Sequence, residues 1–289
     1  MKATQTQEYM QQMAALMTEA LNSPEGLRAL AAAIAPPIEQ AIAVKEISTL
    51  LLSKHVLPKG ESAKYQKKPT VKAYWISSTG EARESEVGKD EVTAETHRIA
   101  SEPLVDVDVL KTGNIGSLMD IQQAAADEIR KETDKRTITV ISAAVPSANV
   151  VHCYGGALTE GALNEAISIL EDLELQAKWV VMRGRRFNDC RGWELDPQTD
   201  NELRVKGAIK NWGTATFLLT STMALDEVLV HPTDEIGKMP VKSELATEPI
   251  NLPTRFKTGW LVWQEIGHIV TRPEITVKIT IHAEEAPEG

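Results

Sequence analysis

The segment between Gly259 and Ile281 constrains the fold more than any other part of the sequence. It reads GWLVWQEIGHIVTRPEITVKITI, which is an apolar run, a break at Arg272-Pro273 and a strictly alternating run. In the second run isoleucine or valine faces one way while threonine or lysine faces the other, which is typical of a half-buried β-strand. Two of the chain's few aromatic residues lie in the first run. We therefore predict that the chain closes with a β-hairpin.

Composition and charge narrow the class of protein. The chain has 289 residues, 42% of them hydrophobic, which is enough for one large domain or two modest ones and excludes global disorder. A net charge of −10 disfavours autonomous DNA binding, because such proteins carry a basic face, although it does not exclude enclosing nucleic acid in a container.

The cysteine content and the N-terminal sequence both indicate a protein made in the cytoplasm. The two cysteines, Cys153 and Cys190, are too few for a disulfide framework and fit a reducing cytoplasm. No apolar run approaches the ~20 residues of a membrane span, and the first residues lack the pattern of a secretory signal. We expect no membrane association and synthesis in the cytoplasm.

The N-terminal region predicts helix over residues 5–35. Methionines recur at helical spacing at Met10, Met13 and Met17, and this stripe indicates either internal packing or a docking face for a neighbouring subunit. Pro36-Pro37 is expected to interrupt the helix before a second apolar segment, because proline removes a helical donor.

Residues 56–98 differ in character and predict a long two-stranded excursion. Lysines cluster early in this segment and acids late, around a strand-like stretch and a Ser-Ser-Thr-Gly turn signal. A hairpin of this kind is marginal alone in water, so it must lie on its own domain or on a neighbour. An ordinary solvated loop and an intersubunit arm with complementary charge both fit the pattern.

The central region predicts alternating helices and strands. Ser117 is a candidate N-cap for a helix that precedes a β-branched strand over residues 137–141. Thr159 is a candidate cap for a second helix, followed by a buried strand over 179–182. Further strands are expected over 216–221 and 227–231, after a polar loop over 183–213, and residues 232–257, which hold four prolines, are expected to be irregular.

No pattern assembles an active site. His152-Cys153 suggests a nucleophile, but adjacent residues on an extended chain point apart, so a structural role is favoured. The arginines at positions 183, 185, 186 and 191 form a basic cluster that fits a solvated loop better than a phosphate site. Phosphate-loop, zinc-ligand and nucleophile-elbow motifs do not occur, so we expect no enzyme activity, cofactor or metal.

The order of these elements resembles that of the major capsid proteins of tailed bacteriophages, which have the Hong Kong 97-like fold. The resemblance covers nearly the whole chain, rests on element order and the C-terminal pattern, and implies an α+β fold. It implies an N-terminal arm (1–55), an extended β-hairpin loop (56–98), a peripheral domain with a long spine helix from Ser117 (99–144 and 255–289), and an axial domain (145–254).

The resemblance implies a shell-forming function. The chain would self-assemble as pentamers and hexamers into an icosahedral-type phage head around double-stranded DNA. Its partners would be a portal and a separate scaffolding or decoration protein, and it would reside in the virion after assembly in the host cytoplasm. The residues expected to contact neighbouring subunits are Met10, Met13, Met17, Lys64, Lys67, Lys68, Tyr74, Trp75, Glu84, Glu86, Arg185 and Arg186.

Three alternatives stay open at this point. One is an encapsulin-type nanocompartment, which has the same fold around a cargo enzyme. Another is a cytoplasmic α/β enzyme with an unrecognised site near His152 and Cys153. The third is a decoration or tail-tube protein.

Overall fold

The computed structural model describes residues 11–20, 23–58, 60–66, 91–106, 115–193, 211–212, 214–252, 255 and 257–284. Residues 11–20 are helical, and the helices that follow are α2 (Pro24–Lys45), α3 (Ser48–Leu51), α5 (Ile115–Ala144), η1 (Ser147–Asn149), α6 (Glu160–Asp172), α7 (Gly184–Cys190) and η3 (Pro273–Ile275). The strands are β1 (Ser53–Val56), β2 (Lys64–Gln66), β3 (Glu91–Thr93), β4 (Thr96–Ser101), β5 (Leu104–Asp106), β6 (Val150–Cys153), β7 (Ala177–Met182), β8 (Asn211–Trp212), β9 (Ala215–Leu219), β10 (Glu227–Pro232), β11 (Gly237–Leu252), β12 (Lys257–Gly267), β13 (Ile269–Val270) and β14 (Val277–Ile281).

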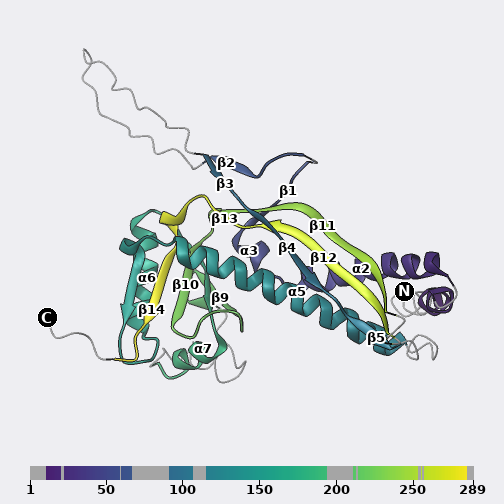
Figure 1. Ribbon diagram of the computed structural model, residues 1–289. Helices are drawn as coiled ribbons and strands as arrows, with labels where there is room; N and C mark the ends of the chain where they lie inside the picture. Colours follow the sequence, from purple (N-terminus) through teal and green to yellow (C-terminus); the bar gives the residue numbers. More distant parts are fainter. Residues whose placement is uncertain are drawn as a thin grey trace, which may run out of the picture.

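The described strands form two larger sheets and one short ladder, in an α+β arrangement. Sheet 1 has the order β1-β11-β12-β4, with β13 also paired to β11 and β5 to β12. Sheet 2 has the order β6-β14-β10-β7-β9-β8, and β2 pairs antiparallel with β3. Figure 1 shows sheet 1 arching along the length of α5, sheet 2 at one end of that helix, and β2–β3 standing off the body.

Helix α5 forms the axis of the molecule because one of its faces is buried along most of its length. Ile129, Thr133, Thr137 and Ile141 follow at intervals of four and are all at most 1% exposed. The first of them packs in a cluster with α2 and Trp260 of β12, and the last packs in a second cluster that reaches both sheets. The long helix therefore joins the N-terminal helices, sheet 1 and sheet 2 into one body.

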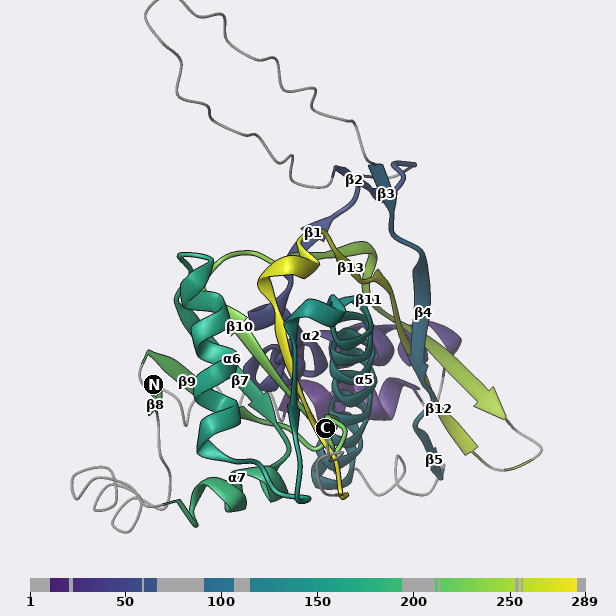
Figure 2. The ribbon, with the colours of Figure 1, turned by 90° about the vertical axis from the view of Figure 1, so that its left-hand side faces the viewer.

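Sheet 2 has its own core under α6. Thr159 caps this helix, as predicted, because its hydroxyl accepts a hydrogen bond from the Ala162 amide at 3.3 Å. The buried face of α6, which includes Leu163, Ala166 and Leu170, packs on β6, β7, β10 and β14. Figure 2 shows α6 on one side of this sheet and α5 on the other.

The predicted alternation at the end of the chain is confirmed, but the predicted closing hairpin is wrong. In β14 the residues Val277, Ile279 and Ile281 are buried, while the residues between them are half-buried. However, β12 pairs with β11 in sheet 1, whereas β14 lies between β6 and β10 in sheet 2. The break at Arg272-Pro273 therefore carries the chain from one sheet to the other.

Two predicted helix boundaries are wrong. Helix α2 continues through Pro36 and Pro37 to Lys45, because the buried series Leu30, Ile34 and Ile38 keeps its spacing of four across the prolines. Helix α5 already begins at Ile115, so Ser117 lies inside its first turn and is not the N-cap.

Residues 137–141 do not form the predicted strand but continue α5 to Ala144. Their β-branched side chains favour strand only as an intrinsic preference, which tertiary packing overrides. Thr137, Ile138 and Ile141 are each at most 4% exposed on the helix face that meets the rest of the protein.

The region 232–257 was expected to be irregular, yet β11 occupies 16 of its residues. Pro240 and Pro249 lie inside this strand, opposite His55 of β1 and Trp260 of β12. Irregular register between Val241 and Ala246 breaks the ladder between the two prolines. Within the loop predicted over 183–213, residues 184–190 form helix α7 instead.

Candidate functional site: the junction of the N-terminal helices with α5

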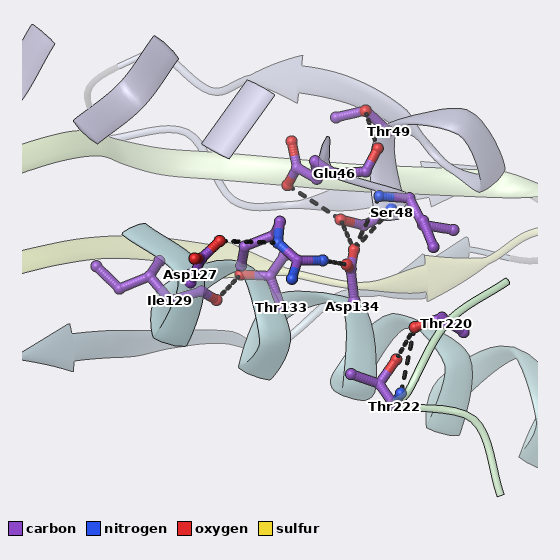
Figure 3. A network of polar contacts seen from close by, with 11 residues as sticks. Glu46, Ser48, Thr49, Asp127, Ile129, Thr133, Asp134, Thr220 and Thr222 are labelled. Carbon is purple, nitrogen blue, oxygen red and sulfur yellow. Dashed lines mark hydrogen bonds and ion pairs between the residues drawn. The ribbon is translucent and has the colours of Figure 1, made fainter. Parts of the chain in front are cut away.

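The N-terminal helices are fastened to α5 by one buried carboxylate. Asp134 is fully buried, and its Oδ1 accepts hydrogen bonds from the amides of Ile47 and Ser48 and from the Ser48 hydroxyl, each at 3.0 Å (Figure 3). These amides open the short helix α3, whose own N-cap residue supplies no side-chain acceptor. Asp134 therefore caps α3 from a helix that lies 86 residues away in the sequence.

Arg130 balances the buried charge of Asp134 from one turn earlier on the same helix. Its Nη1 donates to Asp134 Oδ2 at 3.1 Å, and its Nε lies 3.9 Å from Asp127 Oδ1. The arginine side chain is only 16% exposed. A buried ion pair with additional hydrogen bonds is well suited to specify one arrangement of two elements, since losing either partner strands a charge.

Glu46 adds a second carboxylate to the junction. The Ser48 hydroxyl lies 3.0 Å from both Glu46 Oε1 and Asp134 Oδ1, although a hydroxyl has only one proton to donate. Burial raises the pKa of Glu46 above its usual value, the Ser48 hydrogen bond opposes this, and the nearby Asp134 raises it further. The Ser48 hydroxyl can therefore donate to only one of these two carboxylates at a time.

A polar contact also ties α5 to sheet 1 beside this junction. The Thr133 hydroxyl donates to the Ile129 carbonyl at 2.9 Å and accepts from Gln264 Nε2 of β12 at 3.3 Å. On the other side, the Thr247 hydroxyl of β11 donates to the Ala31 carbonyl of α2 at 2.7 Å. The N-terminal helices, α5 and sheet 1 are therefore linked pairwise by specific hydrogen bonds.

The base of the predicted excursion is anchored on the body. Strands β2 and β3 pair from Lys64↔Thr93 to Gln66↔Glu91, which confirms a two-stranded base. Tyr65 is 8% exposed, and its hydroxyl lies 2.8 Å from His55 Nδ1 of β1. A small apolar cluster surrounds it, comprising Leu57, Ala63, Ala94 and Ile269.

The structure places five of the residues expected to contact neighbouring subunits. Met13 and Met17 are buried by their own chain, in the cluster with α2 and Trp260, so they pack internally and offer no docking face in the single chain. Lys64 is exposed on β2, and Arg185 is exposed on α7. The other expected residues, namely Met10, Lys67, Lys68, Tyr74, Trp75, Glu84 and Glu86, lie outside the described residues.

Arg186, the fifth of these residues, is largely used within the chain. Its side chain is 13% exposed and donates to Gly156 O at 2.6 Å, to Leu225 O, and to Asp189 Oδ2 at 3.1 Å. Asp189 in turn accepts from the Leu158 amide at 3.0 Å. Arg186 therefore joins α7 to two loops of the sheet 2 module, as a structural bridge.

The two residues of the enzyme alternative do not face each other. Cys153 is buried and its thiol donates to the Ala157 carbonyl at 3.1 Å, whereas His152 is exposed with Nδ1 2.9 Å from His282 Nε2. Tyr154 stacks on the His282 ring at 4.9 Å. This geometry supplies no base to the Cys153 thiol. Burial raises the pKa of the other thiol, Cys190, to about 12, which keeps it protonated.

Sequence reasoning missed Asp134, which fastens the N-terminal helices to α5, and Tyr65, which anchors the base of β2–β3. In the sequence, Asp134 is one of several charged residues close together, and Tyr65 stands in a polar, lysine-rich stretch. One signal was available, since Asp134 lies four residues from Arg130 and on the same helix face as the buried Thr133-Thr137 series.

The described residues contain neither a metal-ion cluster nor a membrane-spanning helix. No group of three or more histidine, cysteine, aspartate or glutamate side chains there is arranged to hold a metal ion. Within the same ranges, no helix combines the length and apolar character that crossing a membrane requires.

Comparisons with known proteins show similarity in structure but not in sequence. No family model matches the chain, and no curated protein matches it. A structure from Microbacterium phage Oxtober96 has a TM-score of 0.63 at 12% identity, over 82% of this chain and 91% of its own. The mature capsid of bacteriophage PhiM1 gives 0.58 at 10% identity, over 82% and 87%. The virus-like particle from Pyrococcus furiosus gives 0.58 at 12% identity, over 85% and 97%. The chain therefore has the α+β, Hong Kong 97-like fold of tailed-bacteriophage capsid structures.

Proposed function

We propose that the chain is a major capsid protein that self-assembles, as pentamers and hexamers, into an icosahedral-type head around double-stranded DNA. The observation that carries the proposal is the anchored pair β2–β3, which stands off a body with the capsid fold. Its base is held by Tyr65 and His55, so whatever extends from it starts in a fixed direction. A fixed starting direction is what a contact between repeated copies requires.

The mechanism is geometric rather than chemical. Head-to-tail contacts close rings when the rotation between copies fits, and rings of five and six tile a closed shell. Each contact can be weak, because it is repeated in every copy. The Asp134 junction contributes by holding the N-terminal helices, α5 and sheet 1 at one relative angle, which sets the angle between neighbours.

Under this proposal the predicted domain names apply. The N-terminal arm is 1–55, the extended loop 56–98, the peripheral domain 99–144 and 255–289, and the axial domain 145–254. Strand β14 falls in the peripheral range but pairs in sheet 2 with strands of the axial range. A net charge of −10 suits an inner wall that does not grip packaged DNA. A portal and a separate scaffolding or decoration protein are the proposed partners, and the virion is the proposed location.

The decisive experiment removes the extension while keeping its base. Gln66 and Glu91 are paired across β2 and β3, so an Asn-Gly dipeptide in place of residues 67–90 closes a two-residue hairpin. We expect this variant to be soluble and folded, with the Tyr65–His55 contact intact, and to form no particles. Electron microscopy and sedimentation velocity of the purified protein measure both properties.

The control inserts a Gly-Ser pair at Gly60, a turn position with a positive φ and nothing near its Cβ, which should leave assembly unchanged. Normal-sized particles from the shortened variant would contradict the proposal. A solitary unaltered chain at all concentrations and salt conditions would contradict it as well.

A shell around protein cargo is the second candidate. The fold also occurs in the virus-like particle from Pyrococcus furiosus, whose chain is covered to 97%, so the fold alone does not select a phage head. Particles purified from a host that expresses the chain with its neighbouring genes distinguish the two functions. DNA protected from nuclease supports the phage head, whereas a co-purifying enzyme protected from protease supports a cargo compartment.

A further inference from the structure

A surface cavity of about 280 Å³ lies between α5 and sheet 1, on the side of strand β4. Two isoleucines give it apolar surface, and four titratable side chains give it polar surface. Its lining is His97 and Ile99 of β4, Glu132 and Arg136 of α5, Ile266 of β12, and His268. It belongs neither to the Asp134 junction nor to the hairpin base.

His268 lines this cavity and has a polar atom that the rest of the described chain leaves unused. Its Nε2 is buried and has no hydrogen-bond partner. Burial, with contributions from the positive charges of Arg136 and His97, lowers its pKa to about 4, so the imidazole is neutral at pH 7. Buried polar atoms are almost always satisfied, and a turn of the His268 ring toward the cavity would bring Nε2 within reach of a group bound there.

Arg136 is the second unused group. Its side chain is exposed and forms no ion pair with any described carboxylate. Glu132, which shares the cavity, lies instead 3.6 Å from Lys135, and His97 lies 3.9 Å from Glu95. One unpaired guanidinium and two imidazoles therefore face one carboxylate that already has a partner.

The chemistry of the lining selects the ligand. A guanidinium and an imidazole N–H both donate to carboxylate oxygens, and isoleucines contact an aliphatic stem. A glutamate or aspartate side chain combines both parts. Acidic residues outnumber basic ones by 41 to 31 in this chain, so a second copy offers such side chains in excess. The far edge of β4 also has no strand partner within the described residues, which leaves room for a neighbouring chain.

We propose that this cavity receives an acidic side chain from a second copy of the chain, with Arg136 and His268 Nε2 as its donors. The inference rests on the proposed self-assembly, and it names a contact that the assembly uses. The contact sits beside the hairpin base and on the helix that carries Asp134. An acidic side chain bound in the cavity therefore fixes the position of the neighbouring copy relative to α5 and sheet 1.

The first test is a charge reversal with a matched control. Arg136→Glu and Lys131→Glu each change the net charge by the same amount on the same helix, and Lys131 is an exposed residue paired with Glu128. Neither should alter the melting temperature of the unassembled chain by more than a few degrees. The threshold is the protein concentration at which the unaltered chain begins to form particles. We expect Lys131→Glu to assemble within about twofold of that concentration, and Arg136→Glu to need at least about tenfold more protein.

The second test uses unassembled subunits below the threshold concentration. N-acetylglutamate should shift the imidazole NMR signals of His268 and raise its pKa, whereas the α-amide of N-acetylglutamine, which has no carboxylate, should not, and Arg136→Glu should abolish the response. A response to inorganic phosphate alone, or equal responses to both amino acids, overturns the assignment of a carboxylate.

The two failures can be told apart. If both variants form particles equally well, the cavity proposal is overturned while the shell function stands. If no particles form but N-acetylglutamate binds at His268, the shell function fails and the carboxylate site stands.

Discussion

Replacing Asp134 by alanine tests whether one side chain holds the N-terminal helices on α5. The change removes the acceptor of three hydrogen bonds from the segment between α2 and α3 and the counter-ion of Arg130. It leaves without partners one half-buried and one buried amide, those of Ile47 and Ser48, and a guanidinium that is only 16% exposed. Breaking a buried pair by removing one partner costs about 3–5 kcal/mol.

The expected loss of about 4 kcal/mol corresponds to a drop in melting temperature on the order of 10 °C for a chain of this size. Asp134→Asn keeps an oxygen for the amides of Ile47 and Ser48 but still leaves Arg130 without its counter-ion, so it should cost about 3 kcal/mol, less than alanine. Asp120→Ala, which removes an exposed carboxylate from the same helix, should stay within about 0.5 kcal/mol of the unaltered chain.

Urea denaturation and amide hydrogen exchange of the unassembled chain measure these effects. Alanine at position 134 should also speed exchange at the Ile47 and Ser48 amides by on the order of a hundredfold, whereas asparagine should largely preserve their protection. If Asp134→Ala is as stable as Asp120→Ala, the capping role argued for Asp134 is refuted.

Four further predictions follow from particular contacts. The pKa of Glu46 is raised, so its ionisation destabilises the folded chain as pH rises through that value; Glu46→Gln should raise the melting temperature at pH 7 and lose this advantage below about pH 4.5. Burial lowers the pKa of His231 from 6.5 to about 3, so stability should fall as pH drops below 6.5, and His231→Leu should reduce that slope in urea titrations by up to about 1.4 kcal/mol per pH unit. A Cβ at Gly259 would meet the Pro103 carbonyl oxygen, between β4 and β5, at 2.2 Å, so alanine there should cost at least about 2 kcal/mol, whereas Gly161→Ala, in open space on α6, should gain up to about 1 kcal/mol by the same denaturation assay. Tyr65→Ala should open β2–β3 to limited proteolysis with little change in the global melting temperature, whereas Tyr65→Phe, which keeps the ring in its apolar cluster, should resist cleavage.

Local sequence signals predicted the elements whose local and tertiary preferences agree. Thr159 caps α6 as expected, and the period of two over residues 275–281 marks a strand buried on one face. The paired base of the excursion was also foreseen. In these places propensity, spacing and burial all favour the same structure.

The failures occur where packing overrides a local preference. Prolines at 36 and 37 lie inside α2 because the apolar face that continues across them is buried against α5 and β12. Threonines at 133 and 137 lie inside α5 because tertiary contacts bury them, and the Thr133 hydroxyl finds the Ile129 carbonyl. An unbroken interval of four in both segments was the signal for helix, and single-residue preferences concealed it.

The candidate site was harder to predict than the elements. Asp134 gains its role from amides 86 residues away, and Tyr65 from a histidine on a different strand. Spacing within one element cannot reveal partners that only the topology brings together. The separation of β12 and β14 into different sheets was missed for the same reason, since the intervening break looks like a turn in the sequence.

The placement of late strands in the middle of both sheets has a consequence for synthesis on the ribosome. Strands β11 and β12 are central in sheet 1, and β14 separates β6 from β10 in sheet 2, so sheet 1 cannot be complete before residue 270 has been translated, nor sheet 2 before residue 281. A nascent or prematurely terminated chain therefore lacks the surfaces that a finished subunit presents. Under the proposed shell function, a chain that stops before β14 should therefore not join an assembly.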